Sequence, residues 1–244
     1  MRPAPHSCLS AALRATNPDS SAFYDCFAFW DDASGIAFSD AVEGIFPLIA
    51  TRDGHTWERL PDPPPGREGE GSFAASGTCV TARGDSLAWF GTGAGPSARV
   101  FRTADRGRTW TFSETPIADG TATTGIASVA FLDDLRGAAF GGDVGSPETP
   151  TASVAVTTDG GRTWELAGRP ERPGAVYGGA FVPGAPTPTM FVVGPSGLAW
   201  SADFGVTWTT ADTTDHWGVS FAGDGTGWAV GAGGRITRIR SGDR

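Results

Sequence analysis

Five residues carry side chains that could bind or react, and they fall in expected loops or at the start of an expected strand: Tyr24, Asp25, Asp40, Glu70 and His216. Carboxylates can work as general acid and base, and hydrolysis of a glycosidic bond needs two of them about 5–9.5 Å apart. An acidic rim can instead attract a basic or metal-carrying partner. No catalytic residue is assigned, because these residues form no recognisable acid–base pair or triad, and we expect them to bind a partner.

Other catalytic arrangements are not indicated. His6, His55 and His216 are scattered, and no Ser/His/Asp or Cys/His set is suggested. The glycine-rich run 91–95 follows an antiparallel-type strand and opens no helix, so it is not a dinucleotide cradle. No metal-ligand spacing and no cofactor motif is present, and we predict neither a metal nor a cofactor.

A repeated segment positions these candidates. It reads Thr-Thr-Asp-Gly-Gly-Arg-Thr-Trp at 157–164, and it recurs at 103–110, at 201–208 and, one residue shorter, at 51–57. Asp followed by Gly between two apolar runs indicates a tight hairpin turn, and the Thr-Trp begins the next strand. The spacing of 44 to 54 residues between tryptophans fits one small antiparallel sheet per repeat.

A second pattern, Phe-x-Asp/Gly-Asp-x-x-Gly-x-Ala, lies upstream of the boxes at 29–37, 131–139 and 221–229, and predicts the first hairpin of each sheet. Together the two patterns predict an all-β fold of about five four-stranded antiparallel blades. The expected blades are 21–60, 71–113, 125–168, 175–210 and 216–240, within one domain of residues 1–244. The second blade is expected to begin with a strand near 72–83, and the last to lack its outer strand.

The repeat Ser/Thr-x-Asp-x-Gly-x-Thr-Trp resembles the Asp box, or BNR repeat, of sialidases and of many non-enzymatic β-propellers. The resemblance implies that each box joins the third and fourth strands of a blade, on the face away from the ligand site. The shortened first copy implies a distorted turn. The residues to which this structural role is assigned are Asp53, Trp57, Asp105, Trp110, Asp159, Trp164, Asp203 and Trp208.

If the box hairpins occupy one face, the remaining loops must occupy the other. That loop face collects residues 40–46, 61–71, 92–97, 114–125, 142–150, 168–175 and 211–216, with Tyr24 and Asp25 at the start of an inner strand. Long loops on a rigid scaffold commonly carry binding sites. We therefore place candidate binding on this face.

Segments around 17–26, 35–40 and 69–79 also resemble a bacterial group of BNR-repeat proteins related to the Ycf48-type photosystem II assembly factors. This resemblance favours a non-catalytic scaffold that binds a protein or a glycan. One alternative is a sialidase-like glycoside hydrolase, although no Arg-Ile-Pro occurs and most arginines flank the boxes. The other is a lectin-like sugar binder that uses Tyr24 or Trp217.

The ends of the chain leave two interpretations open. Residues 8–15 could supply the outer strand of the last blade and close a five-bladed, monomeric ring. Alternatively, Met1 is an internal start, and two blades of a seven-bladed fold, with an export signal, precede it. Residues 1–20 show no signal peptide, so localisation is unassigned, and it is extracytoplasmic if the true start is upstream.

Composition sets further limits. The net charge of −9 argues against nucleic-acid binding, and no apolar run is long enough to span a membrane. The bias toward arginine, with no lysine, is typical of a GC-rich genome. Among Cys8, Cys26 and Cys79, the latter two lie in apolar strand-like runs and are expected to be buried free thiols, with a disulfide as the less favoured alternative.

Overall fold

The computed structural model describes residues 21–240, which form nineteen strands in five antiparallel sheets and one short 3-10 turn, η1 (Ala232–Gly234). The first two sheets contain β1 (Tyr24–Phe29), β2 (Gly35–Ser39), β3 (Leu48–Thr51), β4 (Glu58–Arg59), β5 (Val80–Arg83), β6 (Leu87–Gly91), β7 (Arg99–Thr103) and β8 (Thr111–Glu114). The third and fourth contain β9 (Thr124–Phe131), β10 (Gly137–Asp143), β11 (Val154–Thr157), β12 (Glu165–Leu166), β13 (Gly178–Phe181), β14 (Met190–Gly194), β15 (Gly197–Ser201) and β16 (Thr209–Asp212). The fifth contains β17 (Gly218–Phe221), β18 (Gly227–Gly231) and β19 (Arg235–Ile239).

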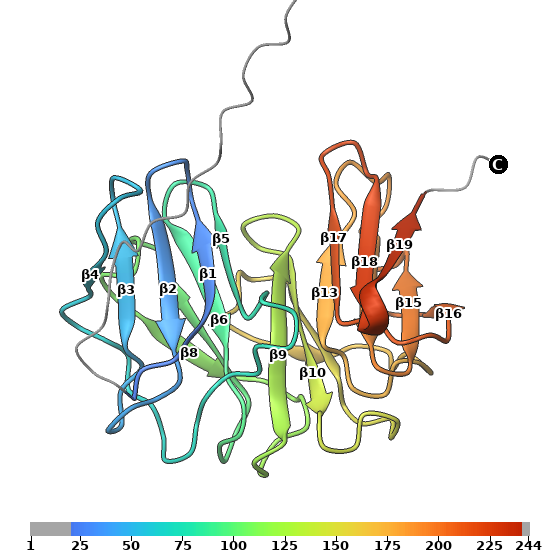
Figure 1. The fold of residues 1–244 in the computed structure, drawn as a ribbon, viewed down its shortest axis with the longest axis horizontal. Helices are drawn as coiled ribbons and strands as arrows, with labels where there is room; N and C mark the ends of the chain where they lie inside the picture. The colour runs from blue at the N-terminus through green and yellow to red at the C-terminus, as the bar shows by residue number, and fades with distance from the viewer. Residues whose placement is uncertain (1–20, 241–244) are drawn as a thin grey trace, which may run out of the picture.

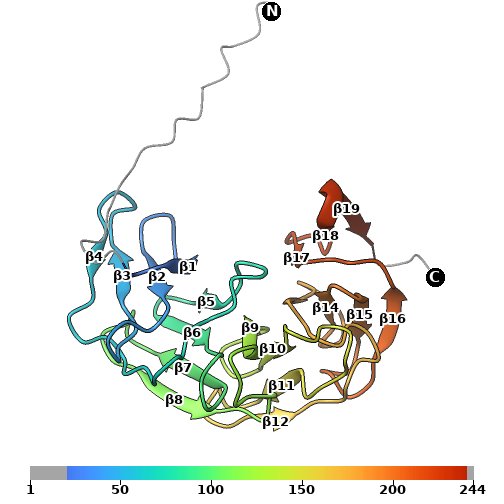
Figure 2. The same ribbon diagram turned by 60° about the horizontal axis from the view of Figure 1, so that its bottom comes forward.

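Within each sheet the strands pair in the order in which they occur in the chain, as in a propeller blade (Figure 1). The five sheets stand side by side along an arc, and β4, β8, β12 and β16 form its outer edge (Figure 2). The fold is therefore an all-β propeller of antiparallel blades, as the repeats predict. No helix in residues 21–240 is long and apolar enough to cross a membrane.

The Asp box forms the hairpin between the third and fourth strands of each of the first four blades. In the third blade, Asp159 Oδ1 accepts hydrogen bonds from the backbone N–H groups of Arg162 (2.9 Å) and Thr163 (3.0 Å), and Oδ2 accepts one from the Thr163 hydroxyl (2.7 Å). The carboxylate thus satisfies donors that the tight turn leaves unpaired. The hydrogen bonds of Asp159 thus stay within its own hairpin.

The shortened first box turns differently from the others. The three full-length boxes each place two successive residues at positive φ, such as Gly160 and Gly161, whereas the first has only Gly54. Asp53 still accepts the backbone N–H groups of His55 (2.8 Å) and Thr56 (2.7 Å). The deletion therefore changes the turn and keeps its hydrogen bonds.

The box carboxylates predict an acid-dependent loss of stability. Burial alone would raise the pKa of Asp159, but hydrogen bonds from Thr163 and Thr157 outweigh it and hold the pKa at about 2. The pKa values of Asp53, Asp105 and Asp203 are lowered by the same kind of bonds, against an opposing effect of burial. A carboxyl with a lowered folded-state pKa stabilises the fold above its unfolded pKa of about 3.9 and loses that contribution as the pH falls through the folded value.

We therefore expect the free energy of unfolding to fall between about pH 4 and pH 2, as measured by urea denaturation at a series of pH values. Asp159→Asn should be less stable than the wild type at neutral pH and should show a shallower decline. A stability that does not change over this interval would contradict the role given to the boxes.

Neighbouring blades are joined by aromatic side chains. Trp89 on β6 is fully buried, stacks on Phe131 of the third blade with ring centroids 3.7 Å apart, and donates its Nε1–H to the Gly160 carbonyl (2.8 Å). A Cβ on Gly161 would lie 3.1 Å from Trp89 Nε1, and its φ is +87°, so glycine suits this position on both counts. The box glycines thus fix the contact between blades as well as the turn.

The two strand-borne cysteines form a disulfide between Cys26 on β1 and Cys79, directly before β5. The expectation of two free buried thiols is therefore wrong. Both residues point into the same interface between the first and second blades, where Phe38 and Phe90 also pack. The bond covalently links these two blades.

Of the expected strand at 72–83, only the last four residues form a strand, β5. Pairing between β5 and β6 begins at Val80 and Phe90, and only an isolated bridge joins Gly71 to Gly93 beyond it. The preceding segment is a loop whose Thr78 hydroxyl contacts the Ser128 hydroxyl on β9 at 2.7 Å. Residues 73–78 therefore leave the second blade, and Thr78 at the end of this loop contacts β9.

The fifth sheet has three strands in the described part of the chain, so β19 is an edge strand there. The proposed closing strand, residues 8–15, lies outside the described residues. Trp228 on β18 occupies the position that Trp89 has on β6, yet it is 46% exposed whereas Trp89 is 0% exposed. The first and fifth sheets stand at opposite ends of the arc (Figure 2), and residues 21–240 provide no strand pairing between them.

Candidate functional site

The candidate site is a cavity of about 330 Å³ on the loop face, at the inner ends of several blades. Three aromatic residues on its wall each directly precede the first strand of a blade: Phe23 before β1, Tyr177 before β13 and Trp217 before β17. Because equivalent positions of successive blades converge on the axis of a propeller, these side chains lie together although the sequence separates them widely. The remaining wall consists of Asp40, Ser72, Phe73, Ala74, Ala75 and Val144.

Asp40 supplies the carboxylate of this wall. It follows β2, and its Oδ1 accepts a hydrogen bond from the Ser72 N–H at 2.8 Å. A Cβ on Gly71 would come within 2.5 Å of this oxygen, so glycine allows the loop to approach Asp40 closely. Its Oδ2 has no hydrogen-bond partner among the described residues, which leaves this oxygen available to a ligand.

The aromatic rings form an open wall. Phe23 is 65% exposed and Trp217 is 46% exposed. The ring of Trp217 stands almost perpendicular to that of Tyr177, at 88° and with centroids 5.5 Å apart. Burial raises the pKa of Tyr177, so its phenol stays protonated at neutral pH and can donate a hydrogen bond.

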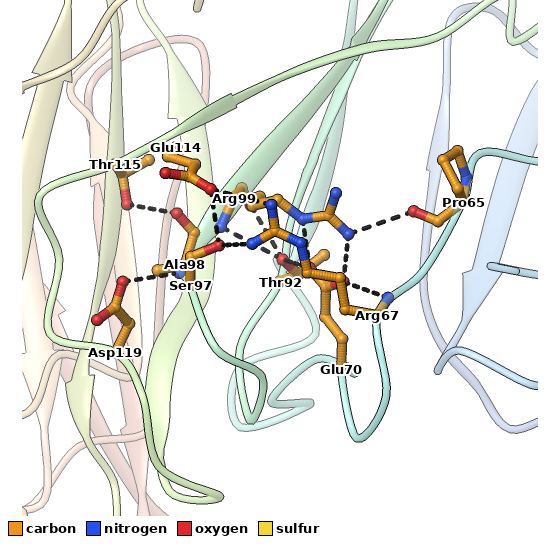
Figure 3. A network of polar contacts seen from close by, with 10 residues as sticks. All are labelled: Pro65, Arg67, Glu70, Thr92, Ser97, Ala98, Arg99, Glu114, Thr115 and Asp119. Carbon is orange, nitrogen blue, oxygen red and sulfur yellow. Dashed lines mark hydrogen bonds and ion pairs between the residues drawn. The ribbon is translucent and has the colours of Figure 1, made fainter. Parts of the chain in front are cut away.

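Glu70, which we expected on the binding rim, is buried beneath it. Its side chain is 0% exposed and forms an ion pair with Arg99, whose side chain is 2% exposed (Figure 3). Oε1 accepts hydrogen bonds from Arg99 Nε (2.8 Å) and the Thr92 hydroxyl (2.6 Å), and Oε2 accepts one from the Arg67 N–H (2.9 Å). The carboxylate is fully engaged within the protein and does not reach a ligand on the loop face.

The other predicted residues are likewise divided between the protein interior and the region of the cavity. His216 is fully buried, with Nδ1 at 3.0 Å from the Thr214 carbonyl and Nε2 at 2.9 Å from the Thr237 hydroxyl on β19. Its backbone N–H donates to the Gly194 carbonyl on β14 (3.1 Å), so it joins the fourth and fifth blades. Tyr24 opens β1 opposite Ser39, next to the cavity residues Phe23 and Asp40. Asp25 is the next residue of that strand, and its side chain is outside the described part of the structure. Of the four candidates whose side chains the structure describes, Asp40 alone is among the residues that line the cavity.

Sequence reasoning missed Phe23, Phe73 and Tyr177, because aromatic residues next to strands resemble core residues. One signal was available: Phe23 and Tyr177 occupy the same position, directly before a blade, as Trp217. No group of three or more histidine, cysteine, aspartate or glutamate side chains that could hold a metal occurs in residues 21–240.

A larger groove of about 860 Å³ lies between the fourth and fifth blades. Apolar residues of both sheets line it, among them Phe191, Trp200, Phe221 and Ile239. Between the third and fourth blades, the Asp box of the fourth blade fills the corresponding place, where Trp208 donates its Nε1–H to the Gly168 carbonyl at 2.7 Å. We therefore attribute this groove to the three-stranded form of the fifth sheet and do not assign a ligand to it.

No protein-family model and no curated protein sequence matches this chain. Among solved structures, an ancestral GH74 enzyme matches 84% of the chain with a TM-score of 0.54 and 13% identity, and the match covers 28% of that enzyme. The NanB sialidase of Streptococcus pneumoniae matches 77% of the chain with a TM-score of 0.50 and 14% identity, over 33% of its own length. Ycf48 from Cyanidioschyzon merolae matches 87% of the chain, with a TM-score of 0.37 and 15% identity, over 78% of its length.

These likenesses show the fold, a β-propeller. The chain spans about a third or less of the length of the GH74 enzyme and the sialidase, and its identity to them is low.

Proposed function

We propose that the chain is a binding or assembly scaffold that holds a protein partner at the loop-face cavity and has no catalytic activity of its own. The observation that carries this proposal is the cavity wall, in which exposed aromatic rings surround Asp40, the one carboxylate among its described lining residues. Aromatic side chains bury large areas on contact and are enriched at protein interfaces. A rigid propeller provides such a wall with a fixed shape.

The buried position of Glu70 supports the same interpretation. A hydrolase that uses an acid and a base needs two carboxyl groups that face the substrate. Glu70 instead accepts hydrogen bonds from Arg99, Thr92 and Arg67 inside the protein. Asp40 and Glu70 therefore do not form the pair that a glycoside hydrolase would use, and Asp25 is left as the second carboxyl to test.

Site-specific photo-cross-linking tests the proposal. A benzophenone amino acid replaces Trp217 or, separately, Phe23 on the loop face, and Val206 in the box hairpin of the fourth blade provides the control because it is 70% exposed on the opposite face. We expect irradiation in the native host to give a discrete adduct with one protein from the loop-face positions and none from position 206. Adducts that form equally from both faces would contradict binding at the cavity.

Two further assays distinguish the alternatives. Turnover of fluorogenic glycosides that is abolished by Asp40→Asn or Asp25→Asn would replace the scaffold proposal with a hydrolase. The exposed ring of Trp217 also suits stacking on a sugar, so a lectin is the second candidate function. Retention on a glycan array without turnover, lost in Trp217→Leu, would establish the lectin instead.

A further inference from the structure

The loop-face cavity combines a carboxylate with aromatic rings and has no basic side chain among its described lining residues. The chain contains no lysine, and none of the described arginines lines the cavity. Asp40 is half-buried, with one oxygen held by Ser72 and the other without a partner in the described structure. A carboxylate that is partly withdrawn from water gains most from a positively charged partner.

At two other places in the molecule, an aromatic ring and a carboxylate lie together with an arginine. The Arg99 guanidinium lies over the Phe101 ring, 4.6 Å from its centroid, and pairs with Glu70. The Arg106 guanidinium lies 5.8 Å from the Trp30 ring centroid and pairs with Asp31 at 3.3 Å. An aromatic face beside a carboxylate therefore already holds an arginine at two places in this fold, one buried and one exposed.

We infer that the cavity takes a basic side chain, an arginine guanidinium or a lysine ammonium, that projects from the protein partner and lies against the ring of Trp217, beside Tyr177, with Asp40 as its counter-ion. This inference rests on the proposed function and names the chemistry of the partner. The two rings stand at 88° to one another, so a planar guanidinium that stacks on one ring meets the edge of the other. Tryptophan offers the most favourable face for a cation.

The charge around the cavity favours the same partner. Asp143 lies next to the lining residue Val144, and its Oδ1 accepts hydrogen bonds from the Thr123 hydroxyl (2.7 Å) and the Gly145 N–H (2.9 Å). The whole chain carries a net charge of −9. A negative rim raises the local concentration of basic groups and steers them toward the opening. An acidic partner would meet repulsion from both sources.

Two short peptides test the inference. The first is the acetylated, amidated pentapeptide Gly-Gly-Arg-Gly-Gly, and the second replaces arginine with citrulline, which has nearly the same shape and no charge. Binding is measured by NMR titration of the tryptophan indole N–H signals of the full chain. We expect the arginine peptide to shift the Trp217 signal and to bind about tenfold or more tightly than the citrulline peptide, with an affinity that falls as salt is added.

Matched variants locate the effect. Asp40→Asn keeps an oxygen for the Ser72 N–H and removes the charge, and Trp217→Leu removes the ring. Glu148→Gln removes an exposed acid on the same face that does not line the cavity. We expect the first two to weaken arginine-peptide binding about tenfold and the third to leave it unchanged, with urea unfolding showing that all three remain folded.

The outcomes separate this inference from the function on which it rests. Equal binding of the arginine and citrulline peptides, or full binding by Asp40→Asn, would show that the cavity does not select a cationic side chain. If Asp40→Asn nevertheless still forms the photo-adduct from position 23, the scaffold proposal stands and only the chemistry of the partner is wrong. Displacement of the Trp217 signal by a glycan but not by the arginine peptide would overturn the inference in favour of the lectin.

Discussion

Glu70→Ala is expected to lower the free energy of unfolding by about 3–5 kcal/mol, because it leaves a buried arginine without its counter-ion. Arg99 is 2% exposed, and Glu70 accepts its Nε and Nη2 hydrogens (Figure 3). In the variant, Arg99 would keep one hydrogen bond to the Pro65 carbonyl (3.2 Å) and its contacts with aromatic rings. The Thr92 hydroxyl and the Arg67 N–H would also lose their acceptor.

Urea denaturation of matched variants measures this loss. Glu68→Ala removes a nearby exposed carboxylate and should change the stability by less than about 0.5 kcal/mol. The double variant Glu70→Leu with Arg99→Met removes both charges, and it should be more stable than Glu70→Ala alone because no buried charge is left unpaired. A loss in Glu70→Ala no larger than that in Glu68→Ala would show that the buried ion pair of Glu70 with Arg99 does not stabilise the fold.

The burial of Glu70 could not be predicted from the sequence. Glu70 lies in an acidic, glycine-rich loop and resembles a surface ligand in every local respect. Its partner Arg99 begins β7, twenty-nine residues later, and only the folding of the loop over the second blade brings the two together. A buried ion pair between distant segments has no periodic pattern, so residue type and position alone could not distinguish it from an exposed rim.

The blades themselves were predictable because their signals are local. Each box contains its own turn, its own hydrogen-bond donors and the tryptophan that packs over it, so one short segment determines one hairpin. The same reasoning failed at residues 73–78, where the segment does not pair with β6 and Thr78 instead accepts a backbone hydrogen bond from Val129 of β9. Pairing with a distant strand is not encoded in the local sequence.

The cavity was half predictable for a related reason. Connectivity placed Asp40 on the loop face, and Trp217 was named as a ring that a sugar binder could use, whereas Phe23 and Tyr177 were not identified as lining residues. Whether these positions converge on the propeller axis depends on the number of blades and on the curvature of the arc that they form. No single repeat encodes either property. The equivalence of positions 23, 177 and 217 becomes useful only when the blade order is known.

Replacement of both Cys26 and Cys79 with alanine is expected to lower the free energy of unfolding by about 4 kcal/mol in the chain-entropy model of disulfide stabilisation. The bond joins residues 53 positions apart, so its loss releases a long loop in the unfolded chain. Cys26 and Cys79 are buried between the first two blades, and alanine leaves only small voids there. Most of the loss should therefore come from the cross-link.

Reduction of the disulfide distinguishes the contribution of the bond to stability from that of the packing around it. In urea with dithiothreitol, the wild type should fall to nearly the stability of the double alanine variant, and the variant itself should not respond to the reductant. Cys8→Ser, which removes the remaining cysteine, should respond as the wild type does. A thiol titration of the urea-unfolded, unreduced protein should find one free thiol, because two of the three cysteines are paired. Three free thiols, or a wild type that dithiothreitol does not destabilise, would show that the two blades are held by packing alone.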